Sequence, residues 1–152
     1  MKKVMVIGTG GTISGYSTDR LDMKNYRSGI LSVEDIIAEI PEINQIANVK
    51  VDQLENFSST SMTTYHWIKL KHKVEQYLNE MDYDGVVITH GTNTLEETAF
   101  FLNYTVNTDK PVILVGAMRP FSAIGTDACI NLVNAIRVAA DPNSRKKGVF
   151  VV

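Results

Sequence analysis

Two short segments rich in glycine and threonine carry the residues that could do chemistry. The first is Gly8-Thr9-Gly10-Gly11-Thr12-Ile13 and the second is His90-Gly91-Thr92-Asn93-Thr94. Each follows an apolar run, at residues 4–7 and 85–89, that predicts a strand buried on both faces. Ligands bind beyond the carboxyl ends of such strands in open α/β sheets. A threonine hydroxyl placed there beside backbone N–H groups could act as a nucleophile next to an oxyanion hole.

The first segment alone allows two other interpretations. It could be a tight glycine turn in which Thr12 bonds its own backbone, or a loop whose N–H groups bind phosphate. It is neither a Walker A sequence nor a full dinucleotide fingerprint, and it contains no lysine. A nucleotide-binding domain is therefore a hypothesis that depends on the glycines alone.

The elements that must position these segments alternate between strand and helix. Further strands are expected at residues 49–54, 111–116 and 148–152, and helices at 64–81 and 128–140. This alternation predicts an α/β fold: a three-layer, doubly wound, mainly parallel sheet of the Rossmann-like or flavodoxin-like kind, in a single domain.

Capping signals and loops refine this picture. Ser32 with Asp35, and Thr94 with Glu97, each predict a capping box at a helix start. A helix beginning at Thr94 would add partial positive charge beside the second segment. Residues 14–28 are polar and aperiodic, which predicts a loop or mobile hairpin that could close over the strand ends.

Composition excludes several functional classes. The 152 residues carry a formal net charge of -2, which gives no electrostatic case for binding nucleic acid. One cysteine and three histidines supply no disulfide or zinc framework, so we expect no metal site. No stretch is long and apolar enough for a membrane span. The expected location is cytoplasmic, or periplasmic or secreted if a signal peptide was removed.

Taken together and in order, the two segments resemble the signatures of the bacterial-type L-asparaginase family. Gly116-Ala117-Met118-Arg119-Pro120 continues the resemblance, while Asn48-Val49-Lys50 and Asp109-Lys110-Pro111-Val112 are similar to the secreted, high-affinity branch. The resemblance runs through the whole chain. It implies that residues 1–152 form the N-terminal catalytic domain, without the smaller C-terminal domain of the family.

The resemblance implies hydrolysis of the side-chain amide of L-asparagine to L-aspartate and ammonia, through a threonine acyl-enzyme and without a cofactor. It implies that Thr12 is the nucleophile, that Tyr26 assists it, and that Thr92 is the second catalytic threonine. It also implies a homo-oligomer, a tetramer in full-length members, in which neighbouring subunits complete each active site.

Substrate binding follows from the same resemblance. Ser59 matches the serine that binds the α-carboxylate, and Thr60 and Asn93 occupy positions that contact the α-ammonium. Gly11 and Gly91 belong to the loops that could supply oxyanion donors.

Three departures from the family pattern predict weak activity. Asn93 stands where the family has an aspartate, and Thr60 where many members have glutamine or glutamate. Both changes weaken the hold on an α-ammonium, because the neutral Asn93 loses the ion pair that an aspartate would make and Thr60 replaces another contact to the same group. The chain also stops at Val152, before the lysine that partners the second threonine in the family. The alternatives are a catalytically inactive carboxylate-binding or assembly module, and an amidase for a related amide that lacks the α-ammonium.

Overall fold

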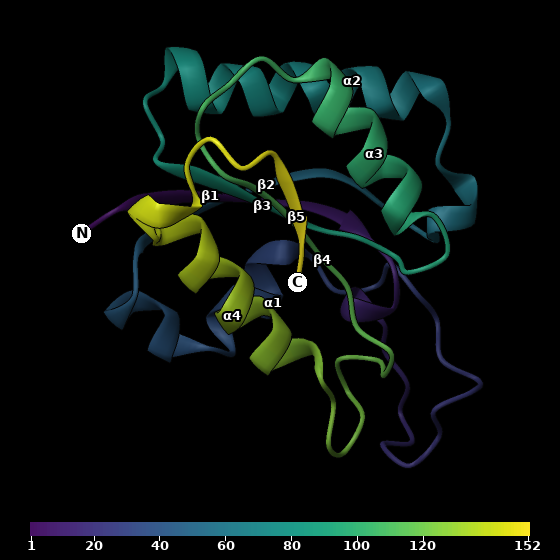
Figure 1. Cartoon of the computed structure of the whole chain (residues 1–152). Coiled ribbons are helices and arrows are strands. Elements are labelled where there is room, and N and C mark those ends of the chain that lie inside the picture. Colours follow the sequence, from purple (N-terminus) through teal and green to yellow (C-terminus); the bar gives the residue numbers. More distant parts are fainter.

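Five parallel strands form one sheet in the computed structural model, which describes residues 1–152 (Figure 1). The sheet has the order β2-β1-β3-β4-β5. The strands are β1 (Lys3–Gly10), β2 (Asn48–Phe57), β3 (Gly85–Thr89), β4 (Val112–Val115) and β5 (Val149–Val151). Since β1 and β3 are neighbours, with Gly8 opposite Thr89, their carboxyl ends lie side by side.

Helices cover both faces of this sheet, as Figure 1 shows. One face carries α1 (Val33–Ala38) and α4 (Ala128–Ala140), and the other carries α2 (Thr64–Glu75) and α3 (Leu95–Thr105). The predicted three-layer, doubly wound parallel fold is therefore confirmed. None of the helices is both long enough and apolar enough to cross a lipid bilayer.

The core consists of two apolar clusters, one on each face of the sheet. Val4 and Val6 of β1 point into the cluster under α1 and α4, whereas Met5 and Ile7 point into the cluster under α2 and α3. This division follows from the two-residue period of a strand, in which successive side chains point to opposite faces. It explains why the strand is apolar at every position.

The structure corrects some sequence-based expectations. The helix expected over 64–81 is α-helical only to Glu75 and then makes one π-helical turn, and Met81 at its expected end is 50% exposed. The capping box predicted at Thr94 is wrong, because Thr94 Oγ1 donates to the carbonyl oxygen of Ser59 at 3.0 Å. The box at Ser32 and Asp35 is present.

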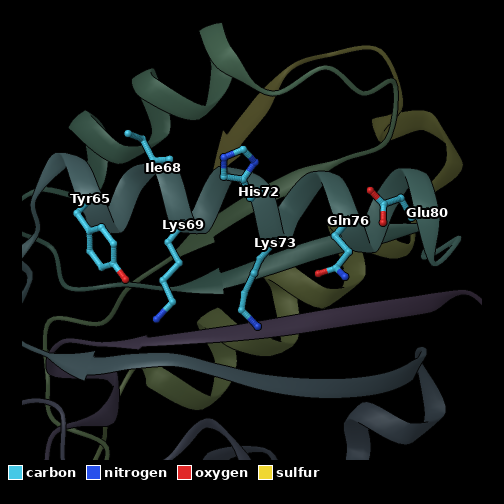
Figure 2. A pocket seen from close by; sticks show the side chains of 7 residues that line it. All are labelled: Tyr65, Ile68, Lys69, His72, Lys73, Gln76 and Glu80. Atoms are coloured by element: carbon cyan, nitrogen blue, oxygen red, sulfur yellow. The ribbon is translucent and has the colours of Figure 1, made fainter.

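Polar contacts fasten α2 to the edge strand β2. The ammonium of Lys73 pairs with the carboxylate of Asp52, and the hydroxyl of Tyr77 donates to the same oxygen at 2.7 Å. Lys69 pairs with Glu55 at 3.1 Å, and Figure 2 shows both lysines pointing from α2 toward the strands. Burial raises the pKa of Asp52, but the bonds from Lys73 and Tyr77 outweigh it and hold the pKa below its usual range.

This pKa shift predicts how acid affects stability. A carboxyl whose folded-state pKa is depressed stabilises the fold above its unfolded pKa, and that stabilisation is lost as the pH falls through the folded-state pKa. We expect Asp52→Asn to lower the free energy of unfolding by about 1 kcal/mol near neutral pH, and by less near about pH 3. Urea unfolding at the two pH values measures this.

The matched control is Asp109→Asn, because Asp109 forms an ion pair with Lys146 at 3.7 Å in which both side chains are at least 70% exposed. Such a pair contributes little. Equal losses in the two variants at both pH values would contradict the role given to Asp52.

Candidate active site

The loops after β1 and β3 touch through their backbones. Gly11 has φ 85° and ψ -171°, a conformation that essentially only glycine adopts. A Cβ atom added to Gly11 would lie 2.4 Å from the Cα and N atoms of Gly91. The two glycine-rich segments therefore meet at this point only because Gly11 carries no side chain.

A third loop, after β2, joins this contact from the other side. A Cβ atom added to Gly91 would lie 2.6 Å from the Oγ of Ser59, which is itself buried. Ser59 is tied to the start of α3 by the bond that its carbonyl accepts from Thr94. The ends of three adjacent strands thus bring Gly11, Ser59 and Gly91 together.

These loops surround a hollow of about 280 Å³, called here the strand-end hollow. Its lining combines hydroxyls, one amide and two glycines with only two apolar side chains. The lining residues are Gly11, Thr12, Tyr26, Ser28, Ser58, Ser59, Gly91, Thr92, Asn93, Ala117 and Met118. Every site residue expected from the sequence lies here except Thr60.

The shortest polar contact in the hollow joins Thr12 and Tyr26. Thr12 Oγ1 lies 2.7 Å from the hydroxyl oxygen of Tyr26, and either group can donate. Tyr26 lies on a hairpin closed by paired backbone bonds between Tyr16 and Arg27, at 2.9 and 3.1 Å. The tyrosine is thus held where it can exchange a proton with the threonine.

Backbone bonds decide which N–H groups remain for a ligand. The N–H of Gly11 donates to the carbonyl of Phe57 at 2.8 Å, so it already has an acceptor. The N–H groups of Thr12 and Thr92 donate to no acceptor within the chain. The N–H groups of these two threonines are therefore available to an oxyanion.

The residues that line the hollow differ from those expected from the sequence: one expected residue lies outside it, and two residues that were not expected line it. Thr60 is exposed outside the hollow, where its hydroxyl lies 3.0 Å from that of Ser58. Ser28 and Ser58 line the hollow but were not singled out from the sequence. Ser58 lies in the hydroxyl-rich run after β2, so the rule that ligands bind at strand ends could have found it.

Ala117 and Met118 follow the end of β4 and close another side of the hollow. Asp127 holds this segment, because its carboxylate accepts from the N–H groups of Met118 and Arg119 at 2.8 and 2.9 Å. Burial raises the pKa of Asp127, but these backbone bonds keep it below the usual range.

No charged side chain lines the strand-end hollow. No group of three or more His, Cys, Asp and Glu side chains elsewhere is arranged to hold a metal ion. A ligand in the hollow would therefore be held by hydroxyls, by the Asn93 amide and by backbone dipoles.

A larger hollow of about 520 Å³ lies along α2 (Figure 2). All of its lining residues come from the single stretch between Tyr65 and Glu80, and its two lysines already pair with carboxylates of β2. Because no strand end or second loop converges there, we place the candidate site at the smaller strand-end hollow.

Comparison with known proteins shows the family to which the chain belongs. Residues 3–152 match the family model described as asparaginase, N-terminal. The chain belongs to this family. It is 43% identical over 152 residues to L-asparaginase 2 of Bacillus subtilis, and 42% identical over 151 residues to the glutaminase-asparaginase of Pseudomonas fluorescens. It covers 40% and 42% of those two proteins.

A solved structure gives the same result. The chain superposes on the probable cytoplasmic L-asparaginase of Campylobacter jejuni with a TM-score of 0.98 at 40% identity. The match covers 100% of this chain and 46% of that one. The asparaginase N-terminal chain described here thus spans less than half the length of these relatives.

The glycine contact makes a prediction about stability. We expect Gly11→Ala to lower the free energy of unfolding by about 2 kcal/mol or more. The backbone conformation of Gly11 is unfavourable for alanine, and the added Cβ would also clash with Gly91. The control is Gly125→Ala, since Gly125 also has a positive φ of 72° but its nearest neighbour, Arg119 Nη1, is 3.7 Å away. Its cost should be only that of the backbone, about 1 kcal/mol. If urea unfolding shows that both variants lose a similar free energy of unfolding, the contact between Gly11 and Gly91 is contradicted.

Proposed function

We propose that this chain hydrolyses the side-chain amide of L-asparagine to L-aspartate and ammonia, with Thr12 as the nucleophile. The observation that carries the proposal is the 2.7 Å contact between Thr12 Oγ1 and the Tyr26 hydroxyl inside a polar hollow. The relatives named L-asparaginase and glutaminase-asparaginase support it.

The reaction follows from this geometry in two stages. Thr12 Oγ1 attacks the amide carbon while Tyr26 receives the threonine proton and gives up its own toward the leaving nitrogen. Ammonia departs and an ester remains on Thr12. Water then attacks the ester, releases L-aspartate and restores the threonine hydroxyl. In both stages the oxyanion would be stabilised by the free N–H groups of Thr12 and Thr92.

The remaining polar groups would bind the substrate. Ser59, at the buried side of the hollow, would donate to the α-carboxylate. The side-chain carbonyl of Asn93 would accept from the α-ammonium, and Thr92 would present its hydroxyl near the reacting carbon. Thr60 would contact the ammonium only if its hydroxyl turned from Ser58 toward the hollow.

A second candidate substrate is an amide that lacks the α-ammonium. The observation that favours it is the neutral lining of the strand-end hollow, in which Asn93 offers a dipole but no charge. Hydrogen bonds to charged groups are worth about 1.5 to 3 kcal/mol when the partner is also well placed, so an aspartate at this position would favour the ammonium.

Ammonia release tests both candidates with one pair of substrates. Succinamate is L-asparagine without its α-amino group, so comparing the two amides isolates the contact to the ammonium. We expect Asn93→Asp to raise kcat/KM for L-asparagine over that for succinamate by about 10- to 100-fold. We expect Thr12→Ala to abolish ammonia release from both.

The matched control is Thr18→Ala, which removes an exposed threonine of the same hairpin outside the hollow. It should keep the activity of the unaltered chain. Ammonia release that survives Thr12→Ala, or falls equally in Thr18→Ala, would contradict the assignment of the nucleophile.

A further inference from the structure

A buried chain of hydrogen bonds runs from α2 through α3 to the loop after β3. The indole N–H of Trp67 donates to Thr98 Oγ1 at 2.8 Å, and Thr98 Oγ1 lies 2.9 Å from His90 Nε2. At the other side of the ring, His90 Nδ1 lies 2.7 Å from the carbonyl oxygen of Gly91. His90 and Thr98 are both 0% exposed, so water cannot replace these partners.

The directions of these bonds are fixed by their chemistry. A carbonyl only accepts, so Nδ1 of His90 must carry a hydrogen. Burial lowers the pKa of His90, against smaller opposing effects of Gly91 and Glu96, and so favours the neutral ring, in which Nε2 has no hydrogen. Thr98 must then donate to Nε2, while Trp67 donates to Thr98. Each hydrogen bond between Trp67 and Gly91 therefore has a single donor, and the His90 ring has a single tautomer.

This chain ends on the peptide group that links Gly91 to Thr92. A trans peptide is planar, and its C=O and N–H point in opposite directions. When His90 holds the Gly91 carbonyl, it also fixes the direction of the Thr92 N–H, which points away from the ring. That N–H donates to no acceptor within the protein. Gly91 has no side chain of its own to settle the orientation of this peptide.

We propose that His90 is a positioning residue for Thr92, acting through the Gly91 carbonyl, and that the Thr98 hydroxyl, which accepts from Trp67, holds the Nε2 side of the ring in place. This proposal rests on the proposed function, in whose site His90 would direct the Thr92 N–H toward the oxyanion. His90 itself does not line the strand-end hollow and would not touch a substrate.

Two substitutions separate positioning from packing. His90→Asn keeps a side-chain N–H near the place of Nδ1, so it can still donate to Gly91, but it loses the acceptor for Thr98. His90→Gln keeps an acceptor near the place of Nε2 but loses the donor to Gly91. The asparagine is the smaller residue and leaves the larger cavity, so it should be the less stable variant. Packing and positioning therefore predict opposite orders of function.

The first measurement is NMR, which does not require the protein to be catalytically active. Nitrogen-15 NMR of the unaltered chain should show His90 neutral with its hydrogen on Nδ1. The Thr92 amide resonance should stay close to its original position in His90→Asn and move in His90→Gln. Thr98→Val should shift the Nε2 resonance of His90 and the Thr92 amide resonance, and Thr98→Ser should leave both near their original positions, because serine keeps the hydroxyl that donates to Nε2.

The second readout is ammonia release. We expect kcat to fall by about 10- to 100-fold in His90→Gln, with a smaller change in KM, and to fall less in His90→Asn. If the chain releases no ammonia, the proposed function fails while the NMR result still decides the positioning role. A hydrogen on Nε2 of His90, or a Thr92 amide resonance that His90→Gln leaves in place, overturns the proposal. If both His90 variants fail to fold, the Thr98 pair gives the same decision.

Discussion

The backbones of Gly11 and Gly91 touch at the carboxyl ends of two neighbouring parallel strands, and the rest of the candidate site depends on this contact. A side chain on Gly11 would meet the backbone of Gly91, and one on Gly91 would meet Ser59, so either change would push apart loops that line the hollow. The sheet supplies the first half of the constraint, because it places β1 and β3 side by side. The positive φ of Gly11 supplies the second half, because it turns the chain toward Gly91 instead of away from it.

The hollow around this contact is lined by peptide groups, hydroxyls and an amide, and by no charged side chain. The peptide groups that form the hollow are held from behind by fixed partners, such as Phe57 for the N–H of Gly11 and His90 for the carbonyl of Gly91. Groups that are already oriented need little reorganisation when an oxyanion forms, which is how such sites stabilise developing charge. The absence of a carboxylate at Asn93 leaves the recognition of an α-ammonium as the weakest part of the site. Chemistry and recognition therefore depend on different residues.

The sequence predicted those parts of the structure that depend on local periodicity and on strand order. The strands ahead of both glycine-rich segments, and α4 over Ala128–Ala140, lie where their apolar patterns indicated. Predictions failed where a side chain found a partner far away in the chain. Thr94 bonds to Ser59 instead of capping its own helix, because the loop after β2 passes beside it. The hydrogen bonds that connect Trp67 to His90 could not be predicted for the same reason, because they join three elements through partners up to 31 residues apart.

A crystal structure of the chain with L-aspartate, the product of the proposed reaction, tests most directly whether the three strand ends form one site. We expect the α-carboxylate of the ligand within hydrogen-bond distance of Ser59 Oγ, and its side-chain carboxyl carbon about 3 to 3.5 Å from Thr12 Oγ1. The oxygen atoms of that carboxyl group should face the N–H groups of Thr12 and Thr92. L-Aspartate bound at any other surface, or an empty strand-end hollow at a concentration that saturates binding in solution, would contradict the assignment of this hollow as the active site.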